Sequence, residues 1–263
     1  MRMIRALWHY RSFVLGLVAR DFRVRYMNSF LGSIWAILNP IAQILVYTLI
    51  FSQIMKAKLP GIDDTFAYSI YLCAGIINWQ YFSEVLTRMQ TIFIEHSELI
   101  KKVSFPRTSL PLFVLMSSSI NYLIMMGLYL IFLILVGHFV GWPILAMIPL
   151  IVLQQCFAIG LGTLLATLNV FFRDIGHIMG VVLQFWFWLT PIVYPRDILP
   201  EGLVWIHNLN PMSWLMKSYQ DLFLLGEWPK WTEGLLLIIL AIVMLFLGYF
   251  AFRRLNKEMV DEL

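Results

Sequence analysis

The sequence is poor in charged residues. Asp, Glu, Lys and Arg make up 13% of its 263 residues, whereas hydrophobic residues make up 60%. A soluble domain has about 25% charged and about 45–50% apolar residues. Because one globular core cannot bury so much apolar surface, the composition excludes an ordinary soluble domain and predicts an integral membrane protein. The length leaves room for a single membrane domain, residues 1–263, without a second large soluble one.

The residues that many enzymatic and metal sites require are also missing. No lysine follows a glycine, so the chain lacks the P-loop that cradles nucleotide phosphates. It has neither H-E-x-x-H nor G-x-S-x-G. Its two cysteines, Cys73 and Cys156, lie in apolar runs, where they are typical of small buried hydrophobes. We therefore predict no catalytic residue, no metal site and no cofactor on this chain.

The sequence does contain long uncharged runs, which predict six membrane-spanning helices. A span needs about 20 mainly apolar residues. Residues 108–172 carry no Asp, Glu, Lys or Arg and are long enough for two spans, with a break at 137–143, where glycine and proline interrupt the run. The predicted fold class is therefore all-α integral membrane. The predicted spans are 30–55, 66–90, 108–136, 144–171, 175–195 and 233–252.

The distribution of Lys and Arg predicts the orientation of these spans. If both termini are cytoplasmic, 14 of the 19 basic residues fall in inner segments and the other five in outer ones. Inner loops carry the excess of Lys and Arg in membrane proteins. We therefore expect a multi-pass protein of the cytoplasmic membrane with both ends inside.

Residues 1–28 predict an amphipathic helix on the inner membrane surface. Several apolar residues recur at three- and four-residue spacing and so share one helical face. They are Leu7, Tyr10, Val14, Leu17 and Val18. We expect this face to lie in the lipid, with the arginines near anionic headgroups. The alternative is a poorly ordered tail; a secretory signal peptide is excluded because arginines interrupt the apolar run.

Residues 196–230 predict an external re-entrant or interfacial hairpin. Within them, 202–216 carry no formal charge but would reach only about 22 Å as a helix, which is short for a crossing. Asn210-Pro211 favours a turn near the middle. A hairpin that enters the membrane and returns accommodates both features.

Residues 92–105 predict a short amphipathic helix in the inner loop. Apolar and charged side chains alternate there at helical spacing, and the helix ends before Pro106 because proline disfavours helix at the preceding residue. Such a helix lies flat on the membrane or docks in a groove on another protein. The composition does not choose between the two.

The predicted spans offer no relay for ion-coupled transport, which usually places ionisable residues at mid-membrane. Glu84 and Arg88 lie four residues apart at the end of the second span, where we expect them to pair on one helical face. A carrier of this kind takes its energy from another subunit or is passive.

Four segments together resemble one family. They are ELIKKVSFPRTSLP (98–111), NVFFRDIGHI (169–178), WLTPIVYPRDILP (188–200) and NLNPMSWLMKSYQDLFLLGEWP (208–229). In this order they are similar to the membrane subunits of ABC-2 type exporters, and most similar to the bacterial branch that exports lipid-linked polysaccharides such as O-antigen, capsule and teichoic-acid precursors. The resemblance covers nearly the whole chain.

The resemblance implies a homodimer of this chain with two copies of a separate ATPase subunit, which would hold ATP and Mg. It also implies that the inner-loop helix is a coupling helix that fits a cleft on that subunit. The residues expected to touch the ATPase are Glu95, Ser97, Glu98, Leu99, Lys101 and Lys102. The expected cargo is polysaccharide on a polyprenyl diphosphate, moved through the bacterial inner membrane; membrane lipid is a partner and nucleic acid is not.

Aromatic and basic residues provide the candidates for cargo contact. Sugar rings stack on aromatic faces, and the channel candidates are Trp79, Tyr81, Trp186, Trp188 and Tyr194. A diphosphate requires cations at its inner entrance, and the candidates are Arg23, Arg25 and Arg88. The alternatives are that the aromatics only mark the bilayer interfaces and that the arginines only set orientation.

Three other functions remain open from the sequence. The chain could be an ABC-2 exporter of a drug or small amphiphile, a membrane transferase acting on lipid-linked sugars, or a passive channel. A transferase is disfavoured because no His, Asp and Glu cluster lies at a predicted membrane face. A passive channel is disfavoured by the coupling-like inner loop.

Overall fold

The protein is described by a computed structural model that covers residues 10–26, 32–54, 64–102, 105–195, 204–256 and 258–263, with the single residues 59, 62 and 202. Parts of several predictions lie outside the described residues. These parts are residues 1–9 and 27–28 of the surface helix, 30–31 and 55 of the first span, 103–104 of the inner loop, and 196–201 and 203 of the external region.

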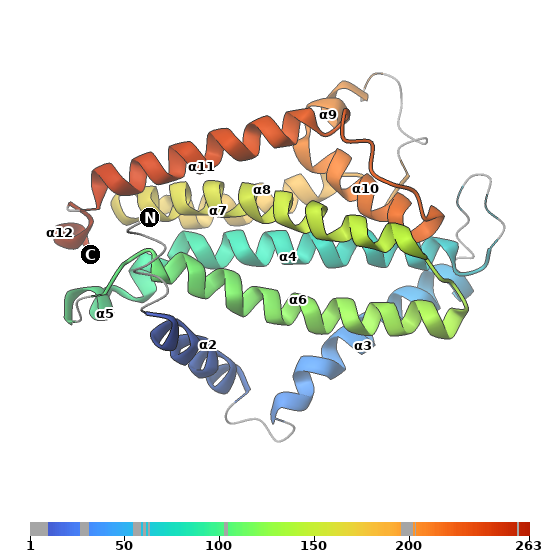
Figure 1. The fold of residues 1–263 in the computed structure, drawn as a ribbon, viewed down its shortest axis with the longest axis horizontal. Helices are drawn as coiled ribbons and strands as arrows, with labels where there is room; N and C mark the ends of the chain where they lie inside the picture. The colour runs from blue at the N-terminus through green and yellow to red at the C-terminus, as the bar shows by residue number, and fades with distance from the viewer. Residues whose placement is uncertain are drawn as a thin grey trace.

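The described residues form helices joined by turns and irregular segments, and the only β-structure among them is one isolated bridge between Leu59 and Ile62. Four long helices run side by side and form the body of the molecule (Figure 1). They are α4 (Ala67–Glu95), α6 (Ser109–Val136), α7 (Met147–Phe171) and α11 (Leu235–Leu255). Helix α8 (Asp174–Leu189) packs against α4 and α7.

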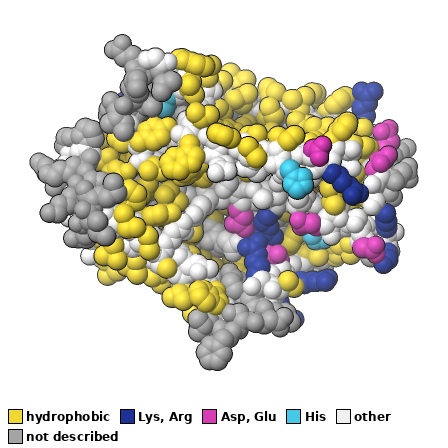
Figure 2. Space-filling view, turned by 180° about the vertical axis from the view of Figure 1, so that it is seen from behind, with side chains coloured by type: hydrophobic (Ala, Val, Ile, Leu, Met, Phe, Trp, Pro, Cys, Tyr) yellow, Lys and Arg dark blue, Asp and Glu magenta, His cyan; other side chains and the backbone are white. Residues whose placement is uncertain are grey.

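Three helical stretches are long and apolar enough to cross a membrane: Ser109–Val136, Trp142–Phe171 with its opening 3-10 turn η3 (Trp142–Ala146), and Leu235–Leu255. Two shorter apolar stretches are Trp35–Phe51 and Asp174–Leu189. In Figure 2 most charged side chains gather toward one end of the molecule, and hydrophobic ones cover much of the rest. This all-helical, apolar-surfaced architecture confirms the predicted membrane fold class; the number of spans stays a prediction.

Helix α4 is the centre of the bundle. Every side chain from Ala67 to Trp79 is buried, because α6, α7, α8 and α10 (Pro211–Leu225) pack around it. An all-round apolar helix requires this kind of enclosure. The helix continues to Glu95, five residues beyond the predicted end of the second span, and it carries both Glu84 and Arg88.

Helices α7 and α11 approach until their backbones touch. A Cβ atom added at Gly160 would lie 2.4 Å from the backbone nitrogen of Leu245, and one added at Gly248 would lie 2.4 Å from the carbonyl oxygen of Gly160. Small residues allow this close contact between membrane helices. The pair therefore forms one rigid wall of the bundle.

The surface helix α2 (Arg11–Tyr26) differs from its prediction in what it buries. Val14 and Val18 are 1% and 6% exposed, because α2 packs against α6. The ring of Phe13 also lies 5.0 Å from that of Phe105. The predicted apolar face therefore packs on protein instead of lipid, since α6 offers it an apolar partner.

The first predicted span is irregular. It begins with the 3-10 turn η1 (Gly32–Ile34), continues as α3 (Trp35–Tyr47) and widens into the π-helix η2 (Thr48–Ile54). Helix α3 contacts α4 and α6 and leaves large apolar side chains exposed on its other side. In Figure 1, α2 and α3 are two inclined helices beside the bundle.

The described part of the predicted external region contains two helices, α9 (Val204–Leu209) and α10, which meet at the predicted Asn210-Pro211 turn. Asn210 caps α10 by accepting a hydrogen bond from the Met212 backbone nitrogen, and proline suits the first helical position. Helix α10 packs on α4 with several fully buried side chains, which are Met212, Leu215, Met216, Tyr219, Leu222 and Phe223. A re-entrant path through the membrane stays a prediction.

Candidate functional site

The predicted coupling helix is a short projection at one end of the bundle. Helix α4 ends at Glu95, His96 breaks the helix with φ −108° and ψ 21°, and α5 (Ser97–Lys102) follows. The His96 Nδ1 atom lies 3.1 Å from the carbonyl oxygen of Ile92. Residues 92–95, predicted as part of the short helix, thus belong to α4, because their backbone continues its hydrogen-bonded turns.

Helix α5 exposes its charged side. Ile100 is buried at 8% exposure, whereas the side chains of Glu98 and Lys102 are 77% and 74% exposed and form an ion pair with each other. Lys101 is exposed as well. An ion pair this exposed adds little stability. The face of α5 that carries these charges is therefore open to a partner.

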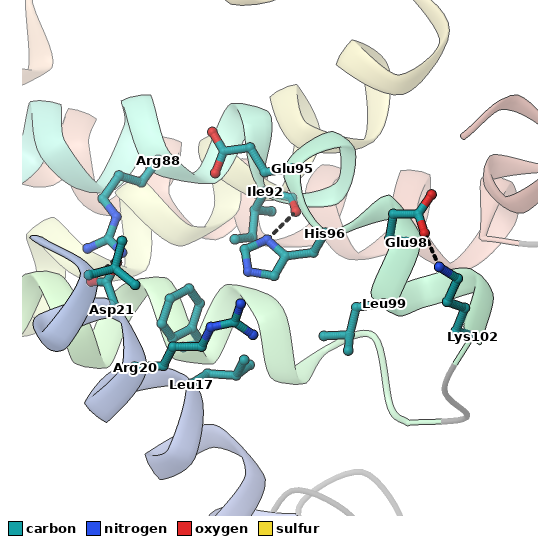
Figure 3. Close-up of a pocket in the computed structure, with 12 residues that line it drawn as sticks. Leu17, Arg20, Asp21, Arg88, Ile92, Glu95, His96, Glu98, Leu99 and Lys102 are labelled. Atoms are coloured by element: carbon teal, nitrogen blue, oxygen red, sulfur yellow. Dashed lines mark hydrogen bonds and ion pairs between the residues drawn. The ribbon is translucent and has the colours of Figure 1, made fainter.

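A cavity of about 590 Å³ separates α5 from α2 (Figure 3). Four of the six predicted ATPase-contacting residues line it, and Ser97 and Lys101 do not. Its lining residues come from α2, α4, α5, α6 and the break between α4 and α5; they are Leu17, Arg20, Asp21, Val24, Arg88, Ile92, Glu95, His96, Glu98, Leu99, Lys102 and Phe113. The cavity combines apolar and charged walls, which suits a protein side chain or an amphipathic ligand.

Beside this cavity, two arginines and two carboxylates form one ionic cluster. The Arg88 Nη2 atom lies 2.9 Å from the Asp21 carboxylate, and Nη1 lies 3.4 Å from that of Glu84. Arg25 reaches both carboxylates, at 3.3 Å to Asp21 and 3.4 Å to Glu84. The predicted Glu84–Arg88 pair thus exists within a larger cluster whose formal charges cancel, and it fastens α2 to α4.

Helix α6 completes the cluster with neutral donors and acceptors. Arg88 Nη1 donates to the hydroxyls of Ser117 at 3.0 Å and Ser118 at 3.3 Å, and the Asn121 amide donates to Glu84 at 2.9 Å. The Arg88 guanidinium also lies 5.6 Å from the centre of the Phe113 ring. Sequence reasoning missed these partners. Their signal was the polar run SSSIN at 117–121 inside an apolar span.

The three predicted diphosphate residues have different surroundings. Arg25 and Arg88 already contact carboxylates in the cluster. Arg23 is exposed and forms no ion pair with any other described residue. Arg20, which the sequence analysis did not select, lines the cavity from α2. The structure therefore brings Arg25 and Arg88 together and separates Arg23 from them.

At the opposite end of the bundle, residues 190–194 form an irregular segment held by neutral side chains. Tyr71 Oη donates to the carbonyl oxygens of Pro191 at 3.2 Å and Tyr194 at 3.1 Å, and Tyr68 Oη donates to Val193. Gln220 of α10 donates to Pro191 and Ile192, at 3.3 and 3.2 Å. Irregular backbone at membrane depth requires such internal partners.

Asn210 joins this segment to α8 and α10. Its Oδ1 atom accepts from Trp186 Nε1 at 2.8 Å and from the Met212 backbone nitrogen at 3.0 Å. Its Nδ2 atom donates to the Thr190 hydroxyl at 2.9 Å and to the Leu189 carbonyl at 3.2 Å. One side chain thus fixes the C-terminal end of α8 relative to the start of α10.

The predicted channel aromatics divide into buried and exposed groups. Trp79 is 5% exposed and its ring lies 6.0 Å from that of Trp186. Tyr81 is 3% exposed, stacks on Tyr122 at 4.3 Å and hydrogen bonds to Ser119 at 2.6 Å. Trp188, by contrast, is 58% exposed.

Tyr194, the remaining channel candidate, is half-buried at the end of the irregular segment. Its hydroxyl donates to the Trp188 carbonyl at 2.8 Å. Within this single chain, Trp79 therefore acts as a packing group, Tyr81 packs on Tyr122 and also borders a small cavity, and Trp188 is open to a ligand or a second chain.

A smaller cavity of about 210 Å³ lies between α3, α4 and α6, next to the ionic cluster. Its walls include amide, aromatic and carboxylate side chains, among them Trp35, Asn39, Gln43, Gln80, Glu84 and Asn121. Amides and carboxylates are the groups that hydrogen bond to hydroxyls. Elsewhere, no three His, Cys, Asp or Glu side chains among the described residues are placed to share a metal ion.

Comparison with known proteins identifies the family. Residues 13–224 match the family described as ABC-2 type transporter. The chain is 29% identical to the O-antigen export system permease protein RfbA of Myxococcus xanthus, with 100% of both chains covered. It is 30% identical to the protein of the same name from Klebsiella pneumoniae, over 93% of this chain and 92% of the relative. It is also 22% identical to the polysialic acid transport protein KpsM of Escherichia coli, over 95% of each. This chain, with its apolar helices and projecting α5, belongs to the ABC-2 type transporter family.

Proposed function

We propose that this chain is the membrane-spanning subunit of an ATP-driven exporter that moves polysaccharide linked to polyprenyl diphosphate across the cytoplasmic membrane of a bacterium. The observation that carries the proposal is the likeness over its full length to O-antigen export permeases. The active assembly would be a homodimer with two copies of a separate ATPase subunit, which holds the ATP and Mg.

The energy would enter through α5. This helix projects from the bundle, exposes Glu98, Lys101 and Lys102, and borders the 590 Å³ cavity. Because it follows α4 after a single break at His96, a push on α5 acts directly on the end of the central helix. Helix displacements of this kind are a common way to switch between two packed arrangements. Glu95 and Ser97 would complete the contact with the ATPase.

The position of α5 also supports the proposed orientation. Helices α5 and α12 (Met259–Glu262) lie at the same end of the molecule, and α9 lies at the other (Figure 1). The charged side chains that face the viewer in Figure 2 also concentrate toward the α5 end. We place this end in the cytoplasm, where the ATPase and its nucleotide would be found.

The cargo would pass along the exposed faces of α3 and α8. Trp188 offers an aromatic face for sugar rings, and Trp186 with Trp79 supports α8 from behind through ring contacts. Tyr81 lines the 210 Å³ cavity together with amide side chains that suit sugar hydroxyls. Tyr194, tied to the Trp188 carbonyl, would set the position of the exit.

The diphosphate would enter at the ionic cluster. Arg23 is exposed at the edge of α2, where it would make the first contact. Arg25 and Arg88 would then exchange the carboxylates of Asp21 and Glu84 for phosphate oxygens. This exchange is favourable because a guanidinium group can form two charge-assisted hydrogen bonds to one phosphate. This exchange would break the ion pairs that hold α2 to α4, so binding of the cargo would loosen α2 from the bundle.

The whole proposal is tested by deleting the gene and examining the surface of the bacterium. We expect surface polysaccharide to disappear on an immunoblot and the lipid-linked precursor to accumulate inside the cell. Complementation with the wild-type chain should restore export. Normal surface polysaccharide in the deletion strain would contradict the function and would favour a drug or amphiphile exporter, which a drug-susceptibility assay would then reveal.

The role of α5 is tested by Glu98→Lys and Leu99→Glu. Both changes alter the face that would dock on the ATPase while leaving the buried Ile100 in place. We expect the variants to reach the membrane at normal levels but to lose co-purifying ATPase or to hydrolyse ATP without export. Wild-type export by both variants would reduce α5 to a surface helix.

The entrance is tested by the double variant Arg23→Gln and Arg25→Gln. We expect export to fall severalfold while the ATPase still co-purifies, because α5 is unchanged. Lys230→Gln, which removes a cation from the external region, serves as the control and should export normally. Equal export by the double variant and this control would remove the entrance hypothesis.

A further inference from the structure

An apolar groove opens between α6, α7 and α11, and none of the four charged residues of the ionic cluster lines it. Its volume is about 250 Å³, and nearly all of its walls are hydrocarbon. The first two turns of α6 form one wall with Pro111, Leu112 and Leu115, and the last turns of α11 form the other with Leu245 and Tyr249. The floor is α7, where the backbone contact at Gly160 brings α11 close.

One cation stands at the end of this groove. Arg107 directly precedes the lining residue Thr108, and its Nη1 atom donates to the carbonyl oxygen and side-chain oxygen of Asn256, the latter at 2.6 Å. Asn256 lies four residues after the lining residue Phe252. Arg107 thus bridges the two walls at the cytoplasmic mouth, and it contacts no carboxylate among the described residues.

A second cation lies one turn beyond the groove on α11. Arg253 follows Tyr249 by four residues and therefore lies near the same helical face. Arg254 follows the lining residue Leu245 by nine residues, which places it on the opposite face of α11. Both arginines are exposed. The mouth of the groove is therefore cationic while its interior is apolar.

We infer that this groove binds a resident anionic phospholipid. One acyl chain would lie against Leu112, Leu115 and Leu245, and the phosphate would lie at Arg107 with Arg253 nearby. The charge supports this occupant, because basic residues at the cytoplasmic end of membrane helices recognise anionic headgroups. A bound lipid would also tie the loop between α5 and α6 to the end of α11, through the same arginine that contacts Asn256.

The groove is separate from the proposed cargo path. On α7, Phe157 faces the channel-side helix α8, with its ring 6.3 Å from that of Trp186. Ile159 and Thr163 line the groove from another face of the same helix. The lipid site therefore does not depend on the polysaccharide or on the ATPase, and its failure would leave the proposed function untouched.

The experiment measures lipid binding to the full-length chain purified in mild detergent. Native mass spectrometry follows titrations with phosphatidylglycerol and with phosphatidylcholine that carry identical acyl chains. One basic residue near an anionic surface favours the anionic lipid by about fivefold. We expect at least that preference for phosphatidylglycerol in the wild type, and its loss in Arg107→Gln. Arg254→Gln, which removes the same charge from the other side of α11, should keep the preference.

Arg107→Gln also removes the contacts to Asn256 and could therefore disturb the fold. A second variant tests the groove without that change. Thr163→Leu adds carbon to the groove floor and leaves every charge in place, so both lipids should bind more weakly with their ratio unchanged. Equal binding of the two lipids to the wild type would overturn the inference. So would displacement of phosphatidylglycerol by undecaprenyl phosphate at equal concentration, or a disulfide between two chains carrying Leu115→Cys.

Discussion

The two ends of the bundle attach their peripheral segments by different kinds of interaction, ion pairs at one end and neutral hydrogen bonds at the other. At the α5 end, α2 is fastened to α4 and α6 by charged groups: Asp21, Glu84, Arg25 and Arg88. At the α9 end, residues 190–194 are fastened by neutral donors, chiefly tyrosine hydroxyls and the Gln220 and Asn210 amides. The first cluster is half-exposed and borders a cavity, whereas most of the second is buried.

The difference indicates which end is built to move. Ion pairs change partners when another anion arrives or when salt screens them. Hydrogen bonds from buried amides to backbone carbonyls have no such competitor, and leaving them unmade is expensive. Under the proposed function, the charged end would respond to cargo and to the ATPase, and the neutral end would stay a fixed frame around the exit.

The largest expected effect comes from removing the shared cation of the charged end. Arg88→Met leaves Asp21 and Glu84 facing each other with Arg25 alone to balance them. Because the Arg88 side chain is 19% exposed, we expect a loss of about 2 kcal/mol, below the 3–5 kcal/mol of a fully buried pair. Thermal unfolding in detergent should fall by about 4–8 °C.

The matched control for this prediction is Lys102→Met, which breaks the exposed pair with Glu98 on α5. Its unfolding temperature should stay within about 2 °C of the wild type. Equal destabilisation by the two variants would show that the half-exposed cluster contributes no more than a surface ion pair, which would contradict the difference between the two ends.

A somewhat smaller effect is expected at the neutral end. Asn210→Ala removes the cap of α10 and the contacts to Trp186, Leu189 and Thr190, at a cost of about 1–2 kcal/mol. Asn210→Asp keeps the acceptor for Trp186 and loses the two donated bonds, so it should fall between the wild type and the alanine variant. Trp fluorescence and thermal unfolding report the change. An aspartate variant as unstable as the alanine variant would mean that the donated bonds carry the whole contribution.

Salt should affect the two ends differently, so they can be compared without any mutation. At 1 M salt the screening length is about 3 Å, so exposed parts of the charged cluster weaken. We expect hydrogen exchange of α2 to rise about two- to threefold between 0.1 and 1 M NaCl, while exchange of α10 stays constant. Hydrogen-exchange mass spectrometry on the detergent-purified chain provides the measurement. Equal responses of α2 and α10 would indicate a general loosening of the bundle.

The smallest effect concerns the Asp221 carboxyl of α10, whose pKa is raised. Burial raises the pKa of Asp221 above its ordinary value, and Lys217 partly opposes this shift. The folded state therefore disfavours the charged form, so stability at this site is lost as the pH rises above the ordinary carboxyl pKa. Asp221→Asn should raise the unfolding temperature by about 1–2 °C at pH 7 and by less at pH 4. Glu262→Gln, on an exposed residue of α12, should change neither value.

The sequence predicts the fold well where burial depends on composition. The uncharged runs locate α6, α7 and α11, and Gly137, with φ +78°, ends α6 at the expected break. Asn210-Pro211 predicts the start of α10 because its capping chemistry is local. These features depend on residues that are neighbours in the chain, so no tertiary information is required.

The site is harder to predict because its contacts cross the chain. Arg88 and Asp21 are separated by 67 positions, and the serines of α6 by a further 29 or 30. Periodicity shows that α2 has an apolar face but does not say that α6 covers it. For the same reason, the sequence alone could not distinguish the buried Trp79 from the exposed Trp188.

In the proposed function, this chain moves cargo only when another subunit pushes α5. Proteoliposomes loaded with lipid-linked polysaccharide test it most directly, with the permease alone, the permease with its ATPase, and the Leu99→Glu permease with the same ATPase. We predict ATP-dependent translocation only in the second set, and ATP hydrolysis without translocation, or no assembly, in the third. Translocation by the permease alone, or undiminished translocation by Leu99→Glu, would contradict the account.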